Sequence, residues 1–185
     1  MRKHLVAPAF GAGAADRAPR AEGRAVSAML TLGIDPGLSG AVGLLDADGM
    51  PELVADLPVI RDRSLAWVDG AALQSMLLEA IHGRPCRAIV ERVSSSPQQG
   101  VASAFTFGIG FGSILATIQT LRLPLELVTP AQWKTALGLG KDKRASLDNA
   151  RLLFPTVELH LARQDGRAEA VLLAHYALTR RAEAA

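Results

Sequence analysis

The spacing of apolar and polar residues divides the first half of the chain into three strands and a helix. Apolar and β-branched runs predict strands over 30–34, 41–45 and 52–57, and the turn sequences DPGLSG and DADG between them predict a meander. Apolar residues at helical spacing then predict a helix over 66–81, which ends at Gly83 with Pro85 beyond.

The second half alternates between strands and helices. A β-branched-rich run predicts a central strand over 87–93, and a second short strand is predicted over 125–128. Helices are predicted over 100–121, 130–136, 143–154 and 166–181, and 156–161 is predicted to be a last strand or an extended segment. A meander followed by such alternation is typical of an α/β fold with a mixed sheet flanked by helices, in which carboxylates at strand ends meet at one edge.

Residues 1–28 differ in composition from the rest of the chain. They are rich in Ala, Arg, Gly and Pro without apolar periodicity, so we expect a disordered extension before one globular domain over 29–185. A translation start at Met29 fits equally well. The extension holds five of the 20 basic and two of the 18 acidic residues, which leaves 15 basic and 16 acidic residues in the domain. The pI of about 9.0 therefore says little about partners.

Cysteine content and a long uncharged segment bear on location. The single cysteine, Cys86, excludes an internal disulfide and a multi-cysteine zinc site, and it fits a cytoplasmic location. Between Arg92 and Arg122 lie 29 uncharged residues, and Gly108 and Gly112 have the spacing of packed membrane helices. The polar run SSSPQQ at the start of this segment favours a buried helix of a soluble protein, and we expect no membrane partner.

Four carboxylates stand where predicted strands end or the last helix begins. Asp35 ends the first strand in GIDPG, Glu91 follows an apolar strand, and Asp165 and Glu169 are four residues apart, so that both project from one helix face. Each has an ordinary alternative: a turn aspartate, a salt bridge to a neighbouring arginine, or a helix cap. Together, carboxylates without His or Cys ligands suit hard cations such as Mg²⁺ or Mn²⁺.

Three acidic motifs in a fixed order resemble a known family. GIDPGLSGA, AIVERV and DGRAEA are similar to motifs of the RuvC-type Holliday-junction resolvases, nearest to their phage-type members, over about residues 30–180. The resemblance implies an RNase H-like mixed sheet, a Mg²⁺-dependent endonuclease with two ions that resolves branched DNA, and a homodimer with the uncharged helix as its interface. It assigns the metal-bridging aspartate to Asp35, the central-strand glutamate to Glu91 and the last-helix acid to Glu169.

Two positions depart from the family pattern. Typical members place their other acid three residues before the last one, where this chain has Gly166, so that Asp165 must serve from four residues away. Ser94 stands near the place of an aromatic residue that wedges the junction. Two alternatives therefore stay open: an RNase H-like nuclease acting on flaps or RNA–DNA hybrids, and a catalytically inactive DNA-binding module.

Basic residues near the loop GLGKDKR are predicted to contact phosphates. A helix start and clustered basic side chains favour binding of a polyanion such as DNA. The alternative is an ordinary mixed-charge helix face exposed to solvent. The predicted DNA contacts are Lys134, Lys141, Lys143 and Arg144. Arg163 and Arg167 flank the acids and are predicted either to meet phosphate or to pair with Asp165 and Glu169.

Overall fold

The computed structural model describes residues 29–63, 65–92, 100–140, 143–160 and 164–183. The predictions made for residues 1–28, Ser94, Lys141 and Arg163 lie outside these ranges. Strands β1 (Leu30–Asp35), β2 (Ala41–Leu45) and β3 (Pro51–Asp56) form the predicted antiparallel meander. Strands β6 (Cys86–Glu91) and β7 (Leu125–Val128) add to it in parallel with β1, which gives the order β3-β2-β1-β6-β7. The predicted α/β mixed sheet is thus confirmed.

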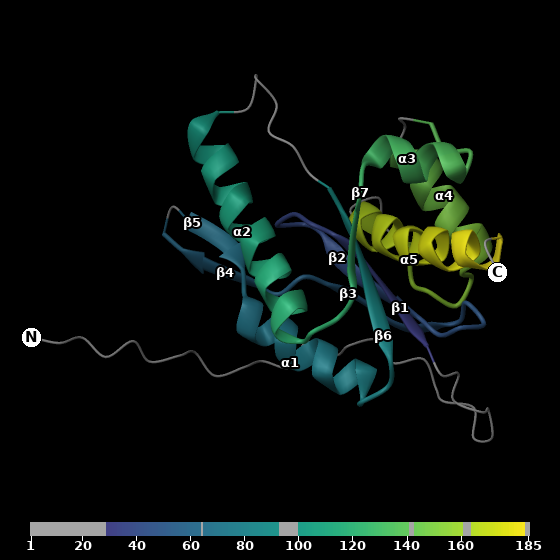
Figure 1. The fold of residues 1–185 in the computed structure, drawn as a ribbon. Coiled ribbons are helices and arrows are strands. Elements are labelled where there is room, and N and C mark those ends of the chain that lie inside the picture. Colours follow the sequence, from purple (N-terminus) through teal and green to yellow (C-terminus); the bar gives the residue numbers. More distant parts are fainter. Residues whose placement is uncertain (1–28, 64, 93–99, 141–142, 161–163, 184–185) are drawn as a thin grey trace, which may run out of the picture.

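Helices cover both faces of this sheet (Figure 1). One face carries α1 (Gly70–Ile81) and α2 (Val101–Thr120), and the other carries α3 (Pro130–Ala136), α4 (Lys143–Leu153) and α5 (Asp165–Glu183). Because side chains alternate along a strand, Leu30, Leu32 and Ile34 of β1 belong to the core under α1 and α2. Asp35, the last residue of β1, therefore points to the opposite face, which α5 covers.

Two predicted elements are wrong in part. The helix predicted over 66–81 begins only at Gly70, since the residues before it form a hairpin of β4 (Val59–Asp62) and β5 (Leu65–Val68). The Asp69 carboxylate accepts hydrogen bonds from the Ala71 and Ala72 amides at 3.0 Å, and this N-cap fixes the helix start. In the second case, no strand forms among the described residues 156–160: Thr156 lies in a turn, Val157 in a bend, and 158–160 have no regular secondary structure.

Helix α2 is less buried than its sequence predicted. Helix α2 packs against α1 and β5, and its buried residues lie from its midpoint onward: Gly110, Ile114, Thr117 and Ile118. By length and composition α2 is apolar enough to cross a membrane, but only 22% of its most apolar window is buried. Val101 and Phe105 near its start are 87% and 65% exposed. The prediction of a buried helix therefore holds for half of α2.

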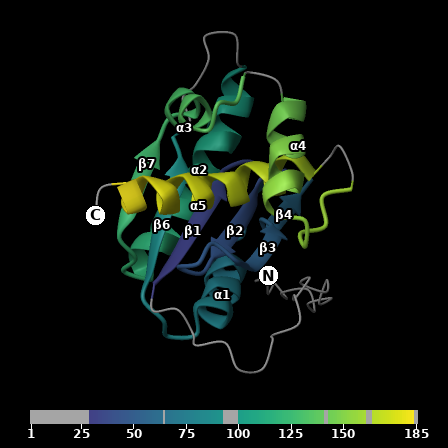
Figure 2. The same cartoon turned by 90° about the vertical axis from the view of Figure 1, so that its right-hand side faces the viewer.

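Two glycines let α5 lie directly on the sheet (Figure 2). Gly33 of β1 pairs with Gly43 of β2 across the antiparallel ladder. A Cβ at Gly33 would lie 2.2 Å from the Ala170 carbonyl oxygen, and a Cβ at Gly43 would lie 2.7 Å from the Val171 Cα. Since the atoms in the way belong to the α5 backbone, a side chain cannot be accommodated by a rotamer change. Helix α5 therefore sits at backbone distance from β1 and β2.

We predict that Gly33→Ala and Gly43→Ala each destabilise the protein by on the order of 3 kcal/mol, because α5 must move off the sheet. Urea unfolding followed by circular dichroism measures the change. The control is Gly112→Ala in α2, where an added Cβ meets nothing within 4 Å. This control is expected to be neutral or stabilising by up to about 1 kcal/mol. Equal effects at Gly43 and Gly112 would contradict the close approach of α5.

Candidate metal-binding site

Asp35 and Glu91 end neighbouring parallel strands on the same face. In the β1–β6 register Gly33 pairs with Ile89 and Ile34 with Val90, so Asp35 and Glu91 follow as the next pair. Ile89 belongs to the core under α5, and by alternation the Glu91 side chain points to that face as well. Both residues are half-buried. The predicted convergence of strand-end carboxylates at one sheet edge is found for these two.

The start of α5 lies against the turn that follows Asp35. A Cβ at Gly166 would lie 2.4 Å from the Ser39 carbonyl oxygen and 3.3 Å from the Asp35 carboxylate oxygen Oδ2. Position 166 therefore has no room for an aspartate while α5 keeps this place. The glycine that departs from the family pattern is the residue that brings the helix start up to Asp35.

Glu169 lies one turn further along α5 and is 9% exposed. Its Oε1 atom accepts a hydrogen bond from the Lys134 ammonium at 2.6 Å and another from the Ser146 hydroxyl at 3.3 Å. Ser146 is fully buried, and only 18% of the Lys134 side chain is exposed. A buried carboxylate of this kind is stable because a cation and a hydroxyl share its charge.

The Glu91 carboxylate is held from α3. The indole N–H of Trp133, whose side chain is fully buried, donates to Glu91 Oε2 at 2.8 Å. Burial raises the pKa of Glu91; the Trp133 hydrogen bond lowers it, the Glu169 charge raises it and the Lys134 charge lowers it. Glu169 thus lies close enough to Glu91 for their charges to interact. These two glutamates, together with Asp35 beside the start of α5, form the acidic cluster.

Asp165 and Arg167 complete the first turn of α5. Asp165 is the first residue of the helix, and its Oδ1 accepts from the Gly166 amide at 3.1 Å. Arg167 donates to both carboxylate oxygens of Asp56, at the end of β3, at 2.6 and 3.0 Å. This ion pair, which the sequence did not predict, ties α5 to the end of β3.

The predicted basic segment divides into different roles. Lys134 lies inside the acidic cluster on Glu169, so it is not the exposed phosphate contact that the sequence suggested. Lys143 begins α4, and Arg144 is exposed in its first turn. Arg151 donates to the Leu159 carbonyl oxygen at 2.7 Å and pairs with Asp148, so it fastens the segment after α4. The predicted contact of Arg144 with DNA stays a prediction.

These acids do not close around one point. Within the described ranges, no three His, Cys, Asp or Glu side chains converge closely enough to hold one metal ion. The chemistry of the predicted donor set fits Mg²⁺ or Mn²⁺, because every predicted ligand is a carboxylate.

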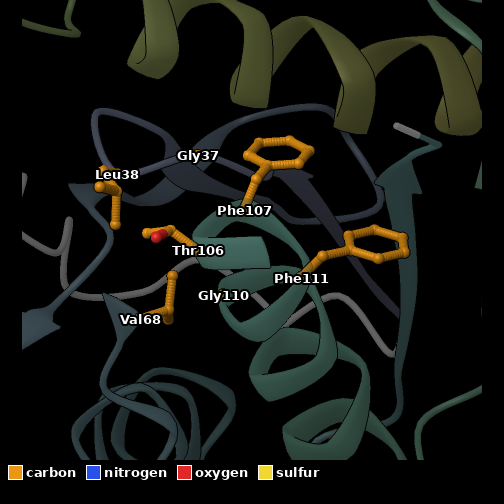
Figure 3. A pocket seen from close by; sticks show the side chains of 7 residues that line it. All are labelled: Gly37, Leu38, Val68, Thr106, Phe107, Gly110 and Phe111. Carbon is orange, nitrogen blue, oxygen red and sulfur yellow. The ribbon is translucent and has the colours of Figure 1, made fainter. Parts of the chain in front are cut away.

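An apolar gap separates the turn after Asp35 from α2 (Figure 3). It measures about 10 Å³, which is room for about one water molecule. Two turn residues, one β5 residue and four α2 residues line it: Gly37, Leu38, Val68, Thr106, Phe107, Gly110 and Phe111. The gap therefore lies in the packing between the turn and α2.

The arrangement of sheet and helices matches two solved structures of RuvC. The RuvC of T. thermophilus in complex with a Holliday-junction substrate is 23% identical, with a TM-score of 0.59, over 85% of this chain and 98% of that one. This chain has the RuvC fold. A second Thermus thermophilus RuvC structure is 21% identical, with a TM-score of 0.52, over 84% and 97%. No family model and no curated protein sequence matches the chain. The predicted RNase H-like architecture is confirmed.

Sequence patterns did not point to two residues that contact the acids. Trp133 and Ser146 lie on α3 and α4, 42 and 23 residues from the glutamates that they contact. Thr129 and Gln132 form a capping box, which the pattern Thr-x-x-Gln signals. That signal places α3 but says nothing of the side chains that it turns toward the sheet.

We predict that Glu91→Gln raises the melting temperature at pH 7 in the absence of divalent cations. The pKa of Glu91 is raised in the folded protein, so its ionised form destabilises the fold above that pKa. Below the unfolded value of about 4.5 both states are protonated, and the advantage of glutamine should vanish. Scanning calorimetry between pH 3.5 and 7.5 measures this, with the exposed Glu79→Gln on α1 as control. A gain that is independent of pH would contradict the role of burial.

Proposed function

We propose that the protein is a RuvC-type, metal-dependent endonuclease of the cytoplasm that resolves four-way DNA junctions. The observation that carries this proposal is the placement of Asp35 and Glu91 as adjacent strand-end carboxylates, with the start of α5 beside Asp35 and the charge of Glu169 close enough to Glu91 to act on it. The likeness in fold to a RuvC bound to a Holliday-junction substrate supports it. Asp165, one turn before Glu169, is the fourth proposed ligand.

The chemistry follows from the carboxylates. Two Mg²⁺ or Mn²⁺ ions held by Asp35, Glu91, Asp165 and Glu169 would supply an activated water and a counter-charge for the leaving oxygen, and the products would carry a 5′-phosphate and a 3′-hydroxyl. The carboxylates must be ionised to serve as ligands. Trp133 and Lys134 favour the ionised form of Glu91, and Lys134 and Ser146 donate to Glu169. Arg144 extends positive charge along the start of α4 toward DNA.

We predict that Asp35→Asn and Glu91→Gln each lower Mg²⁺-dependent cleavage of a synthetic four-way junction on the order of 100-fold or more, because each removes a ligand charge. A chelator should abolish cleavage by the wild type. Labelled junctions, flaps, RNA–DNA hybrids and plain duplexes are compared on denaturing gels. Paired, symmetric nicks in the junction are the expected result, with Glu79→Gln as the matched carboxylate control.

Three results would overturn this function in different ways. Wild-type rates in both Asp35→Asn and Glu91→Gln would refute the metal site. Equal cleavage of all four substrates, with the variants inactive, would keep the nuclease and refute the preference for junctions. Junction binding without cleavage by the wild type would favour the inactive DNA-binding module.

We further propose that the enzyme is a homodimer that pairs through the N-terminal half of α2. A four-way junction has two symmetric strands to cut, and α2 exposes Val101 and Phe105 where a self-complementary surface would lie.

We predict that Phe105→Glu weakens dimerisation about tenfold or more, since a buried aromatic at an interface centre would become a charge. Sedimentation velocity over a concentration series measures the dissociation constant. Leu152→Glu is the control, because Leu152 is 79% exposed on α4, away from α2. A wild type that sediments as a monomer at all concentrations would rule out the dimer.

A further inference from the structure

Trp133 has one polar atom, and that atom contacts a proposed metal ligand. The side chain is fully buried, and its indole N–H can donate but not accept a hydrogen bond. Its acceptor is Glu91 Oε2, at 2.8 Å. A buried indole N–H usually donates a hydrogen bond, and its acceptor is most often a main-chain carbonyl group. Here the acceptor is a side-chain carboxylate at the end of the central strand.

The ring has little freedom to turn away from Glu91. Strand β7 runs parallel to β6 with Val128 opposite Glu91, and α3 begins two residues later. The capping box of Thr129 and Gln132 fixes the first turn of α3. The indole packs in the core with Ile89, Val128 and residues of α4 and α5. Backbone register and core packing therefore both determine the position of the indole N–H.

The hydrogen bond also acts on the orientation of Glu91. It uses one of the two carboxylate oxygens, which restricts the rotation of the carboxylate. Trp133 thus orients the carboxylate.

We propose that Trp133 is a positioning residue that prepares Glu91 to bind a divalent cation. This inference rests on the proposed nuclease function, since it assumes that Glu91 is a metal ligand. Groups that hydrogen-bond to metal ligands typically change metal affinity by about 10- to 100-fold when they are removed. A tryptophan that only fills the core would affect stability and leave metal affinity unchanged.

The test compares Trp133→Phe with Trp67→Phe in the full chain. The protein has two tryptophans, and Trp67 lies on β5 opposite Ile60, outside the acidic cluster. Phenylalanine keeps an apolar ring at position 133 and removes the donor. Mn²⁺ binding is measured by isothermal titration calorimetry at pH 7, and thermal unfolding is recorded for each variant. We expect Mn²⁺ affinity to fall about 10- to 100-fold in Trp133→Phe and to stay within twofold of the wild type in Trp67→Phe.

A second measurement covers the case in which Trp133→Phe does not fold. In the Trp67→Phe background, Trp133 is replaced biosynthetically by benzothienylalanine, in which a sulfur atom takes the place of the indole N–H. The shape of the ring is nearly kept and only the donor is lost. The same Trp67→Phe protein with ¹⁵N-labelled tryptophan gives one indole resonance. Addition of Mg²⁺ should shift this resonance, because its acceptor becomes a metal ligand.

The outcomes separate the inference from the function on which it rests. Mn²⁺ affinity within twofold of the wild type in the benzothienylalanine protein, or an indole resonance indifferent to Mg²⁺, would overturn the positioning role and leave the metal site standing. A wild-type protein that binds no Mn²⁺ would overturn the metal site, and the role of Trp133 with it. Weaker binding in Trp133→Phe and in the benzothienylalanine protein, with Trp67→Phe unchanged, is the result that supports the inference.

Discussion

The contact of the α5 backbone with the backbones of β1 and β2 is the constraint on which the rest of the structure depends. Gly33 and Gly43 are paired in the β1–β2 ladder. The α5 backbone lies against them at Ala170, Val171 and Ala174. Because neither partner has a large side chain here, the distance between helix and sheet is set by main-chain atoms. Interiors at this density transmit small displacements, so the same contact fixes the start of α5 relative to Asp35.

The opposite side of the acidic cluster is held by α3. Two consecutive residues reach two different glutamates: Trp133 binds Glu91 and Lys134 binds Glu169. The short helix α3 thus contacts both the end of β6 and the first turns of α5, which are far apart in the sequence. The two negative charges repel each other, and burial makes this electrostatic cost larger. Hydrogen bonds from donors on α3 and α4 offset it.

Much of the fold was predictable because its periodicities are local. The meander, the two parallel strands and four of the five helices follow from alternation, turn residues and caps that lie within a few positions of one another. The start of α1 was missed because Ala66 and Trp67 satisfy the helical and the extended pattern alike, and only the Asp69 cap decides between them. All of α2 was predicted to be buried, although its buried residues begin only at Gly110, because composition reports apolarity and not contact.

The acids were predictable from motifs, whereas their surroundings were not. Asp35 and Glu91 stand at strand ends, and the parallel register makes them neighbours. The roles of Trp133, Ser146 and Lys134 depend on packing between elements far apart in sequence, for which a single sequence carries no signal. Lys134 was assigned to DNA because a basic segment surrounds it, but α3 turns it toward Glu169.

The glycine at position 166 also changes the side from which the last helix presents its second acid. Successive residues of an α-helix are about 100° apart around the axis. An acid three residues before Glu169 would stand about 60° to one side of it, whereas Asp165, four residues before, stands about 40° to the other side and about 1.5 Å further toward the helix start. Gly166 permits main-chain contact with Ser39, and the second acid of α5 therefore lies on the opposite flank of the helix from position 166.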